Sequence, residues 1–258
     1  MEPLSESLSD SKGIILLAHG LNLRPSKMNT LAHSFSRHGY HSLRGSLSGH
    51  RGNLNEMKLV TRNIWLSEMK AHYCLALEKS QKLGLPLYFV GYSLGAAVLL
   101  DLLKNRDLKN SFQKIIVIAP AIRVHWYTRF PKILAFFSRK IVIPSLNNKD
   151  YRMHKGTTTA AYESLHKIID SFDYPHKKKL KVPILMVIDP DDELVSLDKI
   201  KTMIEKNKLL NWEIFTVSND GAKVKKKYHH LIIDPPTLGE LNFNRLESRM
   251  LRFLNHQY

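Results

Sequence analysis

The sequence has little cysteine and no long hydrophobic run. Cys74 is the single cysteine among 258 residues, so no disulfide can form within the chain, and its place in a periodic apolar segment predicts a buried thiol. A lone cysteine of this kind is typical of a reducing compartment. The apolar runs are all of strand length, which predicts no membrane-spanning helix. The first ten residues are acidic and polar and lack the features of an export signal. We therefore expect a cytoplasmic protein.

The motifs that bind common cofactors are also missing. The sequence contains no His-Glu-x-x-His or Cys-x-x-Cys metal motif and no glycine loop of the kind that cradles phosphate. We therefore expect a function that needs neither a metal ion nor an organic cofactor. No stretch rich in proline, glycine and serine divides the chain, and its 43% of hydrophobic residues can fill one large core. The expectation is a single domain over residues 1–258.

The chain has fewer acidic than basic residues. Its 23 Asp and Glu and 39 Lys and Arg give a formal net charge of +16. The excess is local, since residues 121–182 hold 13 Lys and Arg against 4 Asp and Glu. Nucleic-acid binding is disfavoured, since the sequence shows no zinc-ligand spacing, no RNA-binding aromatic signature and no recognition helix. An anionic membrane surface, an anionic substrate and a solvated basic surface without a specific partner remain as interpretations.

The most informative motif is Gly91-Tyr92-Ser93-Leu94-Gly95. It follows the apolar run of residues 85–90 and precedes an alanine- and leucine-rich stretch, residues 94–104, that predicts a helix. A serine on a sharp turn between a strand and a helix is held clear of its surroundings, so a base and oxyanion donors can reach its hydroxyl. The glycines two residues before and after the serine remove side chains that would collide in such a turn. The motif predicts that Ser93 is a nucleophile.

Strand-length apolar runs alternate with helix-like segments along the chain. This alternation predicts an α/β fold with a mostly parallel central sheet and helices on both faces. Ligands of such sheets bind at the carboxyl ends of the strands, where Ser93 would lie. The predicted strands are 13–18, 39–43, 87–90, 114–118, 184–188 and 212–217, and the predicted helices are 28–38, 57–83, 94–104 and 238–254.

Candidate partners for Ser93 follow two later strands. The loop beyond Ile188 carries several carboxylates, any of which could orient an imidazole, and the segment beyond Val217 carries two adjacent histidines. The order of serine, acid and histidine, each just past a strand, is one of the known arrangements of a catalytic triad. The carboxylate candidates are Asp189, Asp191 and Asp192, and the histidines are His229 and His230.

These residues together resemble the α/β-hydrolase superfamily, and within it the branch of monoacylglycerol lipases, lysophospholipases and small carboxylesterases. The resemblance covers nearly the whole chain. Residues 18–21, Ala-His-Gly-Leu, look like the family's strand-end His-Gly turn, and residues 39–50 look like the Gly-Tyr strand and Gly-His loop that follow it. The fold implied is an α/β hydrolase with a helical cap, here the insertion at about residues 121–180.

The resemblance also implies a choice among the acids and histidines. Asp192 lies three residues before a valine, as in the family's Asp-x-x-Val pattern, and His229 precedes an acidic residue and a proline at the family's spacing. The chain departs from the family in having Ile188-Asp189 where His-Gly is usual. Asp189 and Asp191 therefore stay alternatives to Asp192, and His230 stays an alternative to His229.

The reaction implied is transfer of an acyl group to water. Ser93 would attack an ester carbonyl while His229 takes its proton and Asp192 orients the imidazole. The backbone N–H groups of Leu21 and Leu94 would bind the oxyanion. Acyl glycerols, lysophospholipids or similar lipid-like esters are the substrates expected, with contact between the basic cap and an anionic membrane. An acyl thioesterase, or a silent hydrolase fold that binds a membrane or nucleic acid, is the alternative.

Overall fold

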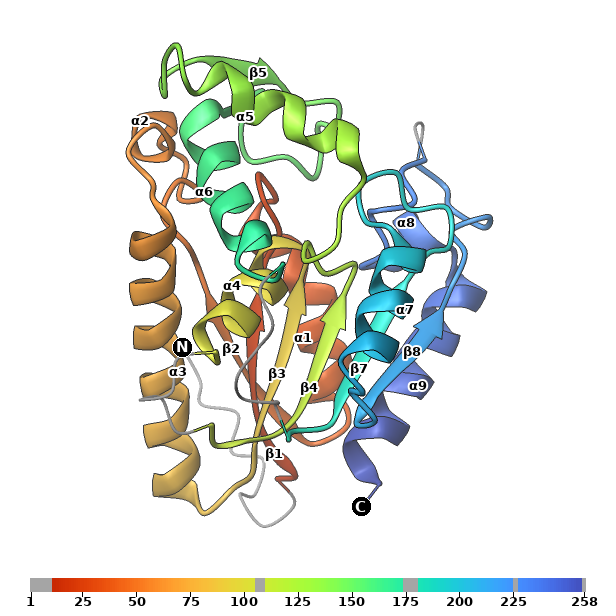
Figure 1. Cartoon of the computed structure of the whole chain (residues 1–258). Coiled ribbons are helices and arrows are strands. Elements are labelled where there is room, and N and C mark those ends of the chain that lie inside the picture. Colours follow the sequence, from red (N-terminus) through yellow and green to blue (C-terminus); the bar gives the residue numbers. More distant parts are fainter. Residues whose placement is uncertain (1–10, 105–109, 174–180, 225–226, 257–258) are drawn as a thin grey trace.

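A six-stranded parallel sheet runs through the computed structural model, which describes residues 11–104, 110–173, 181–224 and 227–256. Its strand order is β2-β1-β3-β4-β7-β8, and every neighbouring pair is parallel (Figure 1). The predicted α/β fold class is therefore confirmed. The strands are β1 Gly13–Ala18, β2 Tyr40–Gly45, β3 Leu87–Tyr92, β4 Phe112–Ile118, β7 Ile184–Ile188 and β8 Trp212–Thr216.

The central strands are apolar along their length because both faces of the sheet are covered. In β1, Ile14 and Leu16 belong to one hydrophobic core, and Ile15 and Leu17 belong to the other. The first core includes residues of α3 Arg62–Leu83, α4 Leu94–Leu102, α6 Thr159–Asp170 and α7 Leu197–Lys206. The second includes residues of α1 Asn29–Ser36, α8 Pro235–Leu238 and α9 Glu240–Asn255. The helices on the two faces can be followed in Figure 1.

The helix predicted at 57–83 is divided in the structure. A short helix, α2 Leu54–Met57, comes first, and α3 begins at Arg62 because the Thr61 side chain accepts the N–H of Ile64. Gly84 ends α3 in the left-handed conformation, as the sequence predicts. The predicted burial of Cys74 is wrong, because the thiol is exposed. The buried stripe of α3 passes through Trp65, Met69, Tyr73, Ala76 and Ser80 and leaves Cys74 outside it.

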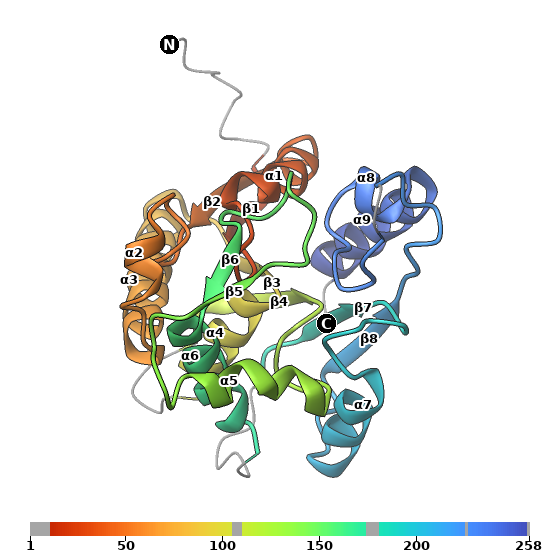
Figure 2. The same cartoon turned by 90° about the horizontal axis from the view of Figure 1, so that it is seen from above.

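The segment between β4 and β7 lies over the carboxyl ends of the strands (Figures 1 and 2). We call this segment the cap. It contains a 3-10 turn, helices and two short antiparallel strands that the sequence did not predict. The last part of the expected insertion, residues 174–180, lies outside the described residues. No helix in the described ranges is both long and apolar enough to cross a membrane. The cap elements are η3 Trp126–Arg129, α5 Phe130–Leu134, β5 Val142–Pro144, β6 Gly156–Thr158 and α6.

Candidate active site

Ser93 occupies the turn between β3 and α4 in a strained backbone conformation. Its φ of 48° and ψ of −109° lie in a region that residues with a side chain rarely adopt. The two glycines of the motif are needed for close packing. A Cβ on Gly91 would come within 2.4 Å of the Phe89 ring, and a Cβ on Gly95 within 2.7 Å of the Ala18 Cβ. The sequence motif therefore folds as the predicted elbow.

The side chains of Ser93, His230 and Asp192 form a hydrogen-bonded row. His230 Nε2 lies 2.9 Å from Ser93 Oγ, and His230 Nδ1 lies 2.9 Å from Asp192 Oδ2. All three residues are buried, at 7%, 8% and 2% exposure for Ser93, His230 and Asp192. Because the carboxylate accepts the Nδ1 proton, Nε2 of the neutral imidazole is left to accept the serine proton. The geometry is that of a nucleophile, a base and an orienting acid.

The acid is itself held firmly by the loop that follows β7. Asp192 Oδ1 accepts the backbone N–H groups of Leu194 and Val195, each at 2.8 Å. These bonds fix the carboxylate in a loop with no regular secondary structure, and both of its oxygens lie near His230 Nδ1, Oδ2 at 2.9 Å and Oδ1 at 3.1 Å. Of the three acids that the sequence offered, the structure brings Asp192 to the histidine that contacts Ser93.

His229, the histidine favoured by the sequence, does not contact Ser93. Its Nδ1 lies 3.1 Å from Asp189 Oδ2, while the adjacent His230 occupies the position next to the serine. Neighbouring side chains on an extended or turning backbone point in different directions, so only one of two consecutive histidines can face the nucleophile. The spacing from His229 to Asp234 and Pro236 favoured His229, whereas the residue that contacts Ser93 is the next one, His230. Asp234 caps α8, and Pro236 lies in its first turn.

The charge environment of His230 favours its protonated form. Burial alone would lower the pKa of the imidazole, but the carboxylates of Asp192 and Glu193 more than offset burial and raise the pKa above its usual value of 6.5. The other group against the ring is Tyr92, whose hydroxyl donates to the His230 carbonyl oxygen at 3.1 Å. An imidazolium formed when the serine loses its proton would therefore be stabilised by these two carboxylates.

The predicted oxyanion donors lie beside the elbow. Leu94 opens α4, so its N–H has no acceptor within that helix, and within the described part of the chain the N–H of Leu21 also lacks a backbone acceptor. The turn that carries Leu21 is joined to the elbow by a bond from Gly95 N–H to the His19 carbonyl, 3.0 Å. A Cβ on Gly20 would lie 2.6 Å from the Tyr92 ring, so the turn packs directly on the nucleophile's neighbour.

Two buried histidines hold this turn in place. His19 Nδ1 donates to the Gly20 carbonyl at 2.9 Å, and its Nε2 accepts the N–H of Leu47 at 3.1 Å. His50 Nε2 accepts the N–H of Asn22 at 2.9 Å. Burial lowers the pKa of His19 to about 4 and holds the pKa of His50 well below 6.5. Both rings are therefore neutral near pH 7, as their acceptor roles require.

One group of side chains could be considered for a metal ion. Within the described ranges, donor atoms of Asp189, Asp191 and His229 lie within 4.8 Å of one another. Asp189 already accepts the N–H of Asp191 at 3.0 Å and the N–H of Asn219 at 2.9 Å, in addition to its contact with His229. These hydrogen bonds already explain why the buried Asp189 carboxylate lies here, so its position is accounted for by contacts within the loops.

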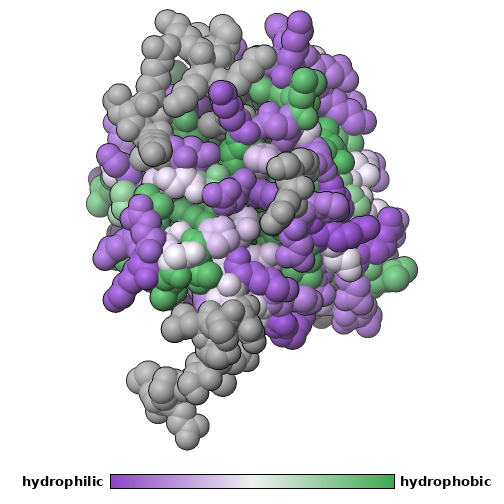
Figure 3. All heavy atoms as spheres, turned by 90° about the horizontal axis from the view of Figure 1, so that it is seen from below, coloured by the Kyte–Doolittle hydropathy of each residue, from purple (hydrophilic) through white to green (hydrophobic). Residues whose placement is uncertain are grey.

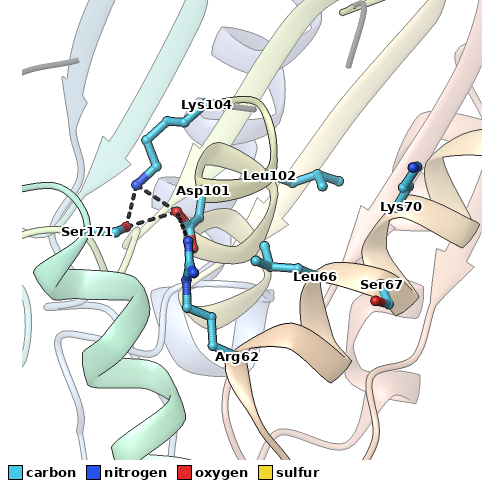
Figure 4. Close-up of a pocket in the computed structure, with 8 residues that line it drawn as sticks. All are labelled: Arg62, Leu66, Ser67, Lys70, Asp101, Leu102, Lys104 and Ser171. Atoms are coloured by element: carbon cyan, nitrogen blue, oxygen red, sulfur yellow. Dashed lines mark hydrogen bonds and ion pairs between the residues drawn. The ribbon is translucent and has the colours of Figure 1, made fainter. Parts of the chain in front are cut away.

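A hollow of about 550 Å³ lies between α3, α4 and α6 (Figure 4). In its lining the buried Asp101 carboxylate binds Arg62 at 2.7 Å, Lys104 at 2.7 Å and the Ser171 hydroxyl at 2.9 Å. Asp101 lies eight residues after Ser93, so it is roughly 12 Å further along the helix. The hollow is therefore separate from the serine, and its ion pairs tie the elbow helix to its neighbours.

Comparisons with known proteins identify relatives of the chain. A model of the serine aminopeptidase S33 family matches residues 9–148. The phospholipase YtpA of Bacillus subtilis (strain 168) is 23% identical over 246 residues, which covers 86% of this chain and 89% of that protein.

Solved structures give the same fold. A soluble variant of the monoglyceride lipase from Saccharomyces cerevisiae, in complex with a substrate analogue, has a TM-score of 0.78 at 17% identity, with 95% of this chain and 87% of that chain covered. The monoacylglycerol lipase of Paleococcus ferrophilus has a TM-score of 0.62 at 14% identity and covers 95% of each chain.

Proposed function

The chain belongs to the serine aminopeptidase S33 family of α/β hydrolases, and we propose that it hydrolyses carboxylic esters with Ser93, His230 and Asp192 as its triad. The observation that carries the proposal is the continuous row of hydrogen bonds from Ser93 Oγ through His230 to Asp192. Lipases and esterases are among the solved structures with this fold, and the curated relative is a phospholipase, which supports an ester over a peptide substrate.

The reaction would proceed through an acyl-enzyme. As Ser93 Oγ bonds to the ester carbonyl carbon, His230 Nε2 takes its proton and the backbone N–H groups of Leu21 and Leu94 hold the oxyanion. When the tetrahedral intermediate collapses, the ester C–O bond breaks and His230 returns the proton to the departing alkoxide. Water then attacks the acyl-enzyme with His230 as base, which releases the carboxylic acid and restores Ser93.

Lipid-like esters, such as acyl glycerols and lysophospholipids, are the substrate class that we propose. Large apolar side chains are concentrated in the cap, directly above the catalytic edge of the sheet, where an acyl chain would have to enter. The names of the curated relative and of the lipase structures agree with this class. A thioester of the same acyl group could react on the same three side chains, so a thioester is the second substrate to test.

The proposal extends to contact between the cap and an anionic membrane surface. Trp126, Phe130, Phe136 and Phe137 are 69%, 58%, 88% and 80% exposed, and exposed aromatic clusters of this kind mark interaction surfaces. Residues 121–149 contain six Lys and Arg and no Asp or Glu. Ion pairs with α6 and its end partly balance this charge, for example Lys132 with Asp170 at 2.6 Å. On the opposite face, hydrophobic residues are scattered among hydrophilic ones (Figure 3).

Hydrolysis of p-nitrophenyl esters from acetate to palmitate tests the proposal directly. We expect turnover by the native protein, none above background by Ser93→Ala, and an optimum at medium or long acyl chains. Labelling by a fluorophosphonate, which reacts with activated serines, should likewise be lost in Ser93→Ala. Turnover that persists without the Ser93 hydroxyl would refute the mechanism, and faster turnover of short neutral esters than of long ones would refute the lipid-like substrate class.

A further inference from the structure

The acid loop places a second carboxylate on His230. Glu193, the residue directly after Asp192, accepts the backbone N–H of His230 on its Oε2 at 3.2 Å. The carbonyl of His230 is bound by the Tyr92 hydroxyl at 3.1 Å. The main chain of the base is therefore held on both sides, independently of the ring contacts to Asp192 and Ser93. The Glu193 carboxylate is half-buried at this position.

The same loop is bonded to the first segment of the cap. The Tyr127 hydroxyl donates to the Glu193 carbonyl, and the backbone N–H of His125 donates to the Leu194 carbonyl at 3.0 Å. Val124 and Val195 form an isolated antiparallel bridge. Together these contacts join residues 123–127 of the cap to the loop that carries the triad acid. A displacement of this part of the cap would therefore act on the main chain of Glu193.

We propose that Glu193 is a positioning residue for His230 and that it links the placement of this base to the cap. Its carboxylate fixes the His230 main chain, and its own carbonyl is fixed by Tyr127. The inference rests on the proposed function, because positioning matters only if His230 acts on Ser93. A histidine held from its main chain as well as from its ring keeps Nε2 within reach of the serine while the cap accommodates a substrate.

The charge of Glu193 adds a second, separable effect. Asp192 and Glu193 are the two carboxylates that raise the pKa of His230, Tyr92 is the other titratable side chain packed on the ring, and burial acts in the opposite direction. Glutamine at position 193 could still accept the N–H of His230 but would carry no charge. Alanine would remove both the acceptor and the charge. The two substitutions therefore separate the hydrogen bond from the electrostatic contribution.

The experiment compares Glu193→Gln and Glu193→Ala with the native protein in a soluble ester assay across pH. We expect Glu193→Gln to keep the plateau kcat within about threefold and to move the acid limb of the kcat/KM profile down by roughly half to one pH unit. We expect Glu193→Ala to lower kcat about tenfold, with KM changed less than twofold, because the base is misplaced. We expect Tyr127→Phe to lower kcat as well, but by a smaller factor.

A matched control is Asp191→Asn, which removes one negative charge from the same loop. Asp191 is not among the groups that shift the pKa of His230, so its profile should stay in place. An unmoved acid limb in Glu193→Gln or an equal shift in Asp191→Asn would overturn the charge effect. A Glu193→Ala variant with native kcat would overturn the positioning role. An unchanged kcat in Tyr127→Phe would overturn the link to the cap.

A failure of the proposed function would be distinguishable from a failure of the inference. If the native protein shows no turnover that depends on Ser93, the proposed function is wrong, whatever the Glu193 variants do. NMR titration of His230 in the native protein and in Glu193→Gln needs no substrate. A lower midpoint in the variant supports the charge effect of Glu193, and an identical midpoint overturns it.

Discussion

Replacing each of the two adjacent histidines with glutamine provides the sharpest test of the site. In His230→Gln the side-chain amide can still donate to Asp192, but it cannot take a proton from Ser93. In His229→Gln the amide can still donate to Asp189, and the row from Ser93 to Asp192 is untouched. The two variants carry the same chemical change one residue apart, so each serves as the control for the other.

We expect the two substitutions to lower activity by different factors. General-base catalysis contributes about 10²–10⁴-fold, and the members of a triad act as one unit, so we expect kcat/KM of His230→Gln to fall by at least about 10³-fold. This fall corresponds to about 4 kcal/mol of transition-state stabilisation. The imidazole of His229 is 32% exposed and lies 3.1 Å from Asp189, away from Ser93, so we expect His229→Gln to stay within about threefold of the native rate.

The assay is initial-rate hydrolysis of a short p-nitrophenyl ester at pH 8, with far-UV circular dichroism and a thermal melt to verify folding. Asp192→Asn and Asp189→Asn extend the comparison to the acids, and only the first should lower activity by orders of magnitude. A larger loss in His229→Gln than in His230→Gln would refute the assignment, since two folded variants would then rank opposite to the hydrogen bonds. Equal losses would show that the two histidines act together.

Three further predictions concern a buried histidine, a glycine of the elbow and the exposed aromatic residues of the cap. The folded-state pKa of His19, about 4, lies below the unfolded value of 6.5, so its contribution to stability is complete above pH 6.5 and is lost as the pH falls towards 4. Between pH 7 and pH 4.5, urea denaturation should show that the free energy of unfolding falls by roughly 3 kcal/mol at most because of this group. His19→Asn should reduce this pH dependence. Gly95→Ala places a Cβ within 2.8 Å of the Ala18 backbone and should destabilise the protein by about 1–3 kcal/mol and lower kcat. Gly221→Ala is the control, because its Cβ would meet the nearest heavy atom, the Gly239 Cα, at the longer distance of 3.3 Å, and it should do neither to the same extent in the same melts and assays. Phe136→Ser with Phe137→Ser should weaken co-sedimentation with anionic vesicles about tenfold or more while hydrolysis of a soluble ester is unchanged, and undiminished vesicle binding would exclude the cap as the docking surface.

The sheet and the elbow were predictable because their signals are local. A continuous apolar run such as residues 184–188 identifies a strand covered on both faces, and the structure has β7 at these residues. Gly91, Ser93 and Gly95 encode a turn whose crowding excludes other residues. The strands of the cap were not predictable. Each of β5 and β6 has three residues, and eleven residues separate them, so neither alternation nor a tight-turn motif marks the pair.

The position of the histidine depended on tertiary contacts that a spacing rule does not contain. His229 and His230 lie in a loop without regular periodicity, so neither periodicity nor spacing could indicate which ring faces the sheet edge. One local signal was available. His230 directly precedes Leu231, Ile232 and Ile233, which are all buried, while His229 lies on the side of the lysine-rich stretch. The histidine attached to the buried run was the one positioned to reach a buried serine.

The duplicated residues that made the sequence ambiguous have distinct structural roles. Asp189 binds His229 and the N–H of Asn219, which anchors the histidine loop to the end of β7. With His229 held there, the next residue is turned towards Ser93, where Asp192 receives its ring and Glu193 its main chain. Asp189 and His229 are therefore best understood as the contact that sets the register of the loop. Each histidine therefore has its own acid, and the two adjacent rings have different partners: His229 lies against Asp189, and His230 lies between Asp192 and Ser93.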